Sequence, residues 1–222
     1  TLQAGFAHQF TTDELIAHLI DAEWDTRFNR RLTRLLKLAN LRHQASLEQI
    51  NFSQKRNLDK NIVLRLSAGD WIKKGDNVLI TGPTGVGKSF IACALGHFAC
   101  INGFMATYAN ALKLFSKLKF AKADGSYTKE LKNIKKQHVF IIDDFGLHPM
   151  DEQSKLILLE ILEDRYGDHS TIITSQLPVG QWHDLIANST IADAICDRLI
   201  HNAYRIEMDG DTMRRRLRSH SG

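Results

Sequence analysis

The stretch GPTGVGKS has residue types and spacing that could bind the phosphates of a nucleotide. It matches the pattern G-x-x-x-x-G-K-[ST] at every specified position. Its glycines let the backbone curl around phosphate oxygens and offer N–H groups to them. Lys88 is placed to reach the β and γ phosphates, and Ser89 to offer its hydroxyl to Mg²⁺. The candidate nucleotide-binding residues are Gly82, Pro83, Thr84, Gly85, Val86, Gly87, Lys88, Ser89 and Phe90.

The surroundings of this loop strengthen the assignment. An apolar strand is expected over 77–81 and a helix over 88–102. The positive N-terminal end of that helix would face a bound anion. The alternative is a glycine turn before a helix without any ligand. It requires all the specified residues and both flanking elements to coincide by chance.

A second motif, VFIIDD, provides acidic groups after an apolar strand expected over 139–142. Ligands of open α/β sheets gather at the carboxyl ends of the strands. We expect Asp143 to hold Mg²⁺ through water, and Asp144 to orient and polarise an attacking water. Alternatively, the two aspartates could cap a helix beginning near residue 151.

Gln176 follows the next expected strand, over 171–174. A polar side chain there could reach the γ phosphate or the attacking water. Polar residues often end strands, so this prediction depends on the two motifs before it.

The elements that must position these residues alternate along the chain. Helices are expected over 88–102, 110–120, 127–136, 151–166 and 190–201, and strands over 77–81, 104–108, 139–142, 171–174 and 203–208. This alternation predicts an α/β fold with a parallel sheet covered by helices on both faces.

The N-terminal part has a different, helical pattern. Thr11 and Glu14 have capping-box spacing, so a helix should begin near Thr12. Apolar residues then recur in two sets, at 15, 16, 19 and 20 and at 28, 32, 35, 36 and 39. The two sets fall on different faces of a regular helix, so the segment is either two helices or one bent helix. Short helices should follow near Ser46 and over 59–67. We divide the chain into an N-terminal helical domain, 1–57, and a second domain, 58–222.

Basic residues oppose the second apolar set of this helix. They are either a solvated outer face or a surface that contacts phosphates. The candidates for contact are Arg27, Arg31 and Arg34.

Composition limits the remaining possibilities. The chain has 222 residues, a net charge of +4 and a pI near 9.0, which only hints at an anionic partner. No apolar run approaches the ~18 residues of a membrane span, and no signal-peptide pattern opens the chain. Three cysteines and ten histidines without metal-ligand spacing indicate buried thiols in a reducing cytoplasm and no transition-metal site. Because it begins at Thr1, we expect a piece of a longer protein.

The order of these motifs resembles the AAA+ ATPases of the DnaC type. The resemblance is closest to the IstB-like transposition helpers, which assist a partner transposase in bacterial insertion sequences. It covers the chain from about Thr11 to Arg218, and rests on RRLTRLLKLANLR, LEQINF, GDWIKKGDNVLITGPTGVGKS, IIDDFGLHPM, TIITSQLP and DRLIHNAYRIEMDG.

The resemblance implies a P-loop NTPase with sheet order 5-1-4-3-2 that uses ATP/ADP and Mg²⁺ and hydrolyses ATP in the bacterial cytoplasm. It implies a homo-oligomeric spiral or ring on duplex DNA that presents the target to the transposase. The N-terminal helical domain should make self or partner contacts. Helices at about 110–136 should face the DNA, with Lys113, Lys117, Lys119 and Lys122 as backbone contacts. The alternative for these side chains is a set of solvated lysines.

The sequence also departs from the pattern of the resemblance. Asp144 and Gln176 stand where glutamate and asparagine are usual, so turnover could be slower or the water differently placed. The chain stops too early for a full helical lid. Arg214 either replaces part of the lid's contact with the nucleotide or belongs to a basic tail.

Arg198 lies late in the expected helix 190–201. In the resembling ATPases such an arginine acts in trans, at the nucleotide of the neighbouring subunit. A guanidinium there would neutralise charge that develops on the γ phosphate. The alternative is a surface arginine paired with Asp197.

Two rival functions remain. A DnaC-type replicative helicase loader would bind a replicative helicase and prefer single-stranded DNA. A small-molecule P-loop kinase would be a monomer with an acceptor pocket under a mobile lid. The acid pair and Arg198 argue against the kinase.

Overall fold

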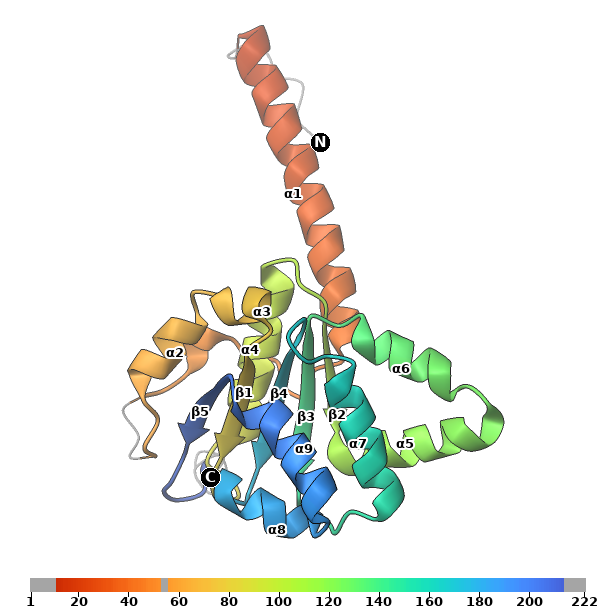
Figure 1. Ribbon diagram of the computed structural model, residues 1–222. Coiled ribbons are helices and arrows are strands. Elements are labelled where there is room, and N and C mark those ends of the chain that lie inside the picture. Colours follow the sequence, from red (N-terminus) through yellow and green to blue (C-terminus); the bar gives the residue numbers. More distant parts are fainter. Residues whose placement is uncertain (1–10, 53–55, 214–222) are drawn as a thin grey trace, which may run out of the picture.

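A five-stranded, entirely parallel sheet forms the centre of the molecule (Figure 1). The computed structural model describes residues 11–52 and 56–213. The strands are β1 Asn77–Thr81, β2 Ala106–Asn110, β3 Val139–Phe145, β4 Ser170–Ser175 and β5 Ala203–Glu207. Their order is β2-β3-β4-β1-β5, which confirms the predicted order 5-1-4-3-2.

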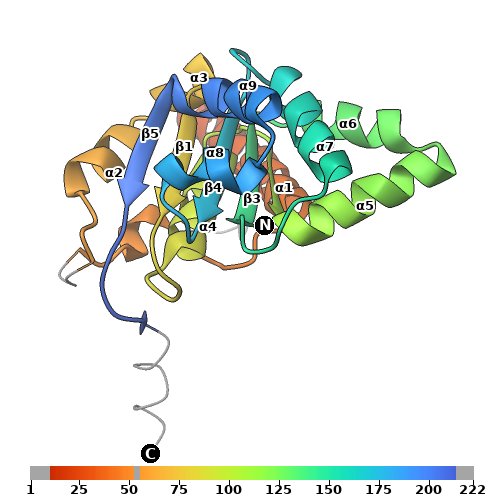
Figure 2. The same ribbon diagram turned by 60° about the horizontal axis from the view of Figure 1, so that its bottom comes forward.

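Helices cover both faces of the sheet (Figure 2). One face packs against the end of α1 and against α2, α3 and α4, which span Thr12–Ala39, Lys60–Leu66, Asp70–Lys74 and Lys88–Ile101. The other packs against α5 to α9, which span Ala111–Asp124, Tyr127–Lys135, Glu152–Glu163, Trp182–Ile186 and Ser189–Ile200. Short 3₁₀ turns lie at Leu47–Gln49 and Val179–Gln181.

The two faces follow from alternation along buried strands. In β1, Val78 and Ile80 enter the core on the α4 side, and Leu79 enters the core on the α7 side. All three are fully buried, because a parallel sheet covered on both sides exposes neither face.

The N-terminal segment is one continuous helix, α1, which projects away from the rest of the molecule (Figure 1). The predicted capping box is present, with the Thr11 backbone N–H donating to Glu14 at 2.8 Å. The two apolar sets have different surroundings. The second set packs on the core through buried Leu35 and Ala39, whereas Ile20 and Trp24 in the projecting part are 63% and 70% exposed.

The segment after α1 joins the core of the second domain. Ala45 and Ile50 are buried in the same hydrophobic cluster as β1 and α4. A capping box between Ser46 and Gln49 opens the 3₁₀ turn there, as the sequence predicted. The division between residues 57 and 58 stays a prediction, and the packing is continuous across it.

β2 begins two residues later than predicted. The Phe104 N–H donates back to the carbonyl of Ala99, at 2.9 Å, so this residue still completes the end of α4. The Met105 N–H donates to the His138 ring at 3.1 Å. The strand ladder therefore starts at Ala106.

Within the two described ranges, no helix is both long and apolar enough to cross a membrane.

Candidate functional site

The phosphate-binding motif forms the loop between β1 and α4, as predicted. Gly82 and Gly85 have φ of 142° and 89°, which a residue with a side chain rarely adopts. A Cβ on Gly82 would also collide with the carbonyl oxygen of Met208, and one on Gly85 with the hydroxyl of Thr212. The chain after β5 therefore packs against the loop at positions where only glycine fits.

Lys88 is folded back onto this loop. Its Nζ donates to the carbonyl oxygens of Gly82 and Pro83, at 2.6 and 2.8 Å, and the residue is buried. This arrangement holds a cation beside the backbone that phosphates would contact. Val86 is buried in the core, so only its backbone is available to a nucleotide.

Asp143 lies near the carboxyl end of β3, directly beside the loop. Its carboxylate is fully buried and accepts hydrogen bonds from Ser89 Oγ at 2.8 Å and from the Tyr108 hydroxyl at 2.6 Å. Thr174 also donates to it, and Arg42 lies 3.2 Å away. Burial acts to raise the pKa of Asp143, but these hydrogen bonds and the nearby guanidinium outweigh it and lower the pKa. The carboxylate is therefore held in its charged form.

Asp144 follows in the left-handed region, at φ 61°, which aspartate adopts more readily than most residues. Its Oδ2 accepts a hydrogen bond from Asn110 at 3.1 Å and lies 3.4 Å from Arg42. The ladder between β3 and β4 is irregular here, and this turns the second acid away from its strand position. The alternative role, capping the helix near 151, belongs to Asp151, which accepts a hydrogen bond from the Ser154 N–H.

The donor set suits Mg²⁺ held together with a nucleotide. Ser89 supplies a hydroxyl, and Asp143 a carboxylate that can accept hydrogen bonds from metal-bound water. Among the described residues, no group of three or more His, Cys, Asp or Glu could hold a metal by itself. Mg²⁺ keeps several waters and binds through one or two carboxylates plus phosphates, so these few ligands fit it.

Gln176 lies directly after β4, half-buried, at the sheet edge where β1 and β3 end. Thr174, two residues earlier, was not predicted as a site residue. Its hydroxyl donates to Asp143 and accepts from the Asp144 N–H at 3.0 Å. A hydroxyl on the strand next to an acid pair is the signal that could have identified it.

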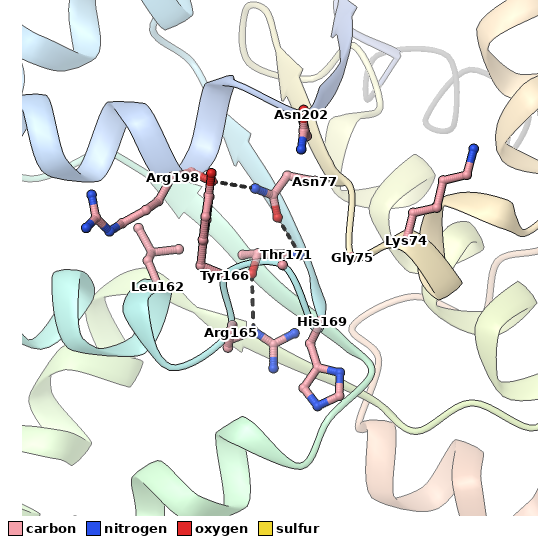
Figure 3. A pocket seen from close by; sticks show the side chains of 11 residues that line it. Lys74, Gly75, Asn77, Leu162, Arg165, Tyr166, His169, Thr171, Arg198 and Asn202 are labelled. Carbon is pink, nitrogen blue, oxygen red and sulfur yellow. Dashed lines mark hydrogen bonds between the residues drawn. The ribbon is translucent and has the colours of Figure 1, made fainter.

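Arg198 lies at the opposite edge of the sheet, where the strands begin. Its carbonyl accepts a hydrogen bond from Asn77, the first residue of β1, at 2.9 Å (Figure 3). The guanidinium is ion-paired with Glu163, lies 3.8 Å from Asp197, and borders a small pocket of about 90 Å³. Arg198 therefore lies at the opposite end of β1 from the phosphate loop of its own chain, and its action at a neighbouring subunit stays a prediction.

The candidate DNA-contacting lysines lie on α5, and three of the four have partners. Lys117 pairs with Glu130 at 2.6 Å and Lys119 with Asp151 at 2.7 Å. Lys122 lies over the ring of Tyr127, with Nζ 4.5 Å from its centroid. Lys113 is exposed beside a groove of about 1030 Å³ between α1, β2, α5 and α6.

The arginines of α1 also differ from one another. Arg27 pairs with Glu23 at 2.6 Å, and Arg31 donates to the Gly103 carbonyl at 3.0 Å. Arg34 is exposed. Arg214 lies outside the described residues.

Arg42, Tyr108 and Asn110 are the other site residues that the sequence did not identify. Tyr108 and Asn110 lie toward the carboxyl end of β2, so the gathering of strand ends could have suggested both. No sequence pattern pointed to Arg42, which reaches the acids from the segment after α1.

Comparison with known proteins places the chain among similar sequences. The family model described as IstB-like ATP binding protein matches residues 2–221. An insertion sequence ATP-binding protein of Sinorhizobium fredii is 46% identical over 217 residues, covering 98% of this chain and 89% of the relative. An ATP-binding protein in an insertion sequence of Mycobacterium tuberculosis is 31% identical over 223 residues, covering 98% and 89%.

Solved structures share the fold. The DnaC helicase loader superposes with a TM-score of 0.61 at 21% identity, over 74% of this chain and 96% of that one. The replication initiator DnaA, bound to AMPPCP and single-stranded DNA, has a TM-score of 0.62 at 16% identity, over 78% and 52%. At these identities the likeness identifies an AAA+ type of P-loop fold and nothing further.

Proposed function

The chain belongs to the family of IstB-like ATP-binding proteins, and we propose that it is a Mg²⁺-dependent ATPase that assembles on duplex DNA and recruits or activates a partner transposase. The observation that carries the ATPase part is the hydrogen bond of 2.8 Å between Ser89 and Asp143. It brings the phosphate loop and the acid strand, 54 residues apart in sequence, into one site at the carboxyl ends of the strands.

The chain's own residues divide the work of hydrolysis. Backbone N–H groups of the loop and the N-terminus of α4 hold the phosphates, and Lys88 leaves its carbonyl partners to reach them. Mg²⁺, when bound beside Ser89 and Asp143, supplies positive charge to the β and γ phosphates. Asp144 positions the attacking water and accepts its proton. Gln176 lies at the same edge and would orient that water or the γ phosphate.

Arg198 completes the site from a neighbouring subunit in this proposal. Its place at the opposite sheet edge keeps it from its own nucleotide, and head-to-tail contacts would bring it to the next one. Hydrolysis then requires assembly. The exposed apolar side chains of α1, which are Ile16, Leu19, Ile20, Trp24 and Phe28, support a role of that helix in self or partner contacts.

DNA contact is proposed for the basic side chains. Lys113 on α5 and Arg34 on α1 are exposed, which suits contacts with phosphates. Such contacts give affinity without sequence readout, as a factor acting at many targets needs. The names of the relatives, insertion sequence ATP-binding proteins, support the link to transposition.

A helicase loader is the second candidate, because the chain shares its fold with the DnaC loader. That likeness concerns the fold alone. Binding to a replicative helicase, with a preference for single-stranded DNA, would favour this role.

The test compares the chain with Lys88→Ala, and uses Lys73→Ala, at an exposed residue of α3, as the matched control. With ATP, Mg²⁺ and duplex DNA, we expect phosphate release and ring or spiral particles in electron micrographs for the parent and the control. Lys88→Ala should lose both. Unchanged phosphate release in Lys88→Ala would refute the assignment of the phosphate site, and monomers at saturating ATP and DNA would refute assembly.

A further inference from the structure

Arg42 lies beside the two carboxylates, Asp143 and Asp144, of the proposed site. Its Nη1 lies 3.2 Å from Oδ2 of Asp143 and 3.4 Å from Oδ2 of Asp144, so one guanidinium bridges both carboxylates. It comes from the segment just after α1, 101 residues before Asp143. The core ATPase motifs do not include it.

The carboxylates of Asp143 and Asp144 both lie beside one guanidinium, and the positive charge there offsets the repulsion between them. Asp143 is fully buried and cannot be screened by water. A carboxylate offers about four acceptor positions. Those of Asp143 are taken by Ser89 and Thr174 on Oδ1 and by Tyr108 and Arg42 on Oδ2. Arg42 is the charged member of this set.

We propose that Arg42 is a place-holder for the divalent cation, neutralising Asp143 and Asp144 until a metal–nucleotide complex enters and displaces it. A doubly charged ion beside the same carboxylates repels the guanidinium and replaces its function. Its bound waters also need an acceptor position on Asp143. The inference rests on the proposed nucleotide site.

The guanidinium has room to leave. Its side chain is 43% exposed, whereas that of Asp143 is 0% exposed. Arg42 borders the groove of about 1030 Å³ that also adjoins Asn110 and Lys113. Displacement therefore requires a rotation of one side chain into open space, with no rearrangement of the core.

The experiment measures how much Mg²⁺ the chain needs to bind a nucleotide. The probe is N-methylanthraniloyl-ADP, titrated with MgCl₂ from a metal-free start in EDTA and followed by fluorescence. Arg42→Gln removes the guanidinium charge that competes with Mg²⁺ for the carboxylates. The Mg²⁺ concentration at the midpoint of the titration should therefore fall by about two- to five-fold, which corresponds to the free energy of a partly exposed ion pair. Metal-free binding should weaken, because the carboxylates then repel the phosphates without compensation.

Two further variants keep the result interpretable. Arg42→Lys retains the charge, and its midpoint should stay within about two-fold of the parent. Lys37→Gln, at an exposed residue in the last turn of α1, should behave as the parent. If Arg42→Gln does not fold, Arg42→Ala takes its place, with the same expected shift and the same refuting outcome.

A midpoint that is unchanged or moves to higher Mg²⁺ in Arg42→Gln would overturn the proposal, because Arg42 would then support the metal-bound carboxylate. Equal shifts in the Gln and Lys variants would also overturn it. Failure of the parent chain to bind the nucleotide at any Mg²⁺ concentration would instead refute the proposed function.

Discussion

The side-chain amide of Asn110 donates to Oδ2 of Asp144 across 3.1 Å, and its own Oδ1 accepts from the backbone N–H of Lys113 at 3.4 Å. One residue therefore caps α5 and contacts the candidate water-activating carboxylate. Two hydrogen bonds through Asn110 thus connect α5, the helix that carries the candidate DNA contacts, to Asp144.

Asp144→Asn should separate binding from hydrolysis. Asparagine fits the left-handed backbone at φ 61° but cannot accept a proton from water. We expect kcat to fall about 10²- to 10⁴-fold, the usual contribution of a general base, with nucleotide affinity within about two-fold. Phosphate release and nucleotide fluorescence measure the two. Asp164→Asn, at the C-terminal end of α7, is the control. Undiminished turnover in Asp144→Asn would exclude Asp144 as the base.

Arg198→Ala should keep nucleotide binding and lose hydrolysis, by about 10³- to 10⁵-fold where such arginines act in trans. Mixing it with Asp144→Asn provides the decisive measurement. An Arg198→Ala subunit retains its own Asp144, and an Asp144→Asn neighbour, which still binds nucleotide, supplies the arginine. Turnover of the mixture should exceed the sum of the two variants. A mixture that is only additive would support a structural role through the ion pair with Glu163.

Lys113→Gln should weaken duplex DNA binding equally across sequences. Removing one phosphate contact lowers the slope of log affinity against log salt by about 1. Lys117→Gln should have a smaller effect, because Lys117 already pairs with Glu130 at 2.6 Å. Fluorescence anisotropy at several salt concentrations measures both, with Lys73→Gln as the control. An unchanged slope for Lys113→Gln would remove it from the DNA surface.

The sheet and the phosphate loop were predictable because their signals are contiguous. β1 was predicted at its observed limits, since Asn77 to Thr81 is a buried run that leads directly into the glycine loop. Asp143 followed from the next buried run. Boundaries were less certain where a helix end and a strand start share apolar residues, as at Phe104.

The rest of the site depends on tertiary contacts that leave no spacing in the sequence. Arg42 contacts Asp143 and Asp144, which follow it by 101 and 102 residues. Arg31, an earlier arginine, contacts the Gly103 carbonyl instead, so a basic residue type alone does not mark the site. The helices α3 and α8 were not predicted, because five residues are too few to show a helical period. The long α1 was ambiguous because its two apolar sets face different surroundings.

The geometry of α1 has a mechanical consequence. The helix is anchored from Arg31 onward, so about 19 residues, or ~29 Å at 1.5 Å per residue, project freely. A tilt of about 10° at the anchored turns would move the tip by ~5 Å. Arg42 lies three residues beyond the last residue of the helix, Ala39. A small displacement of the segment around Arg42, beside Asp143 and Asp144, would thus become a larger movement of the exposed apolar residues at the tip of α1.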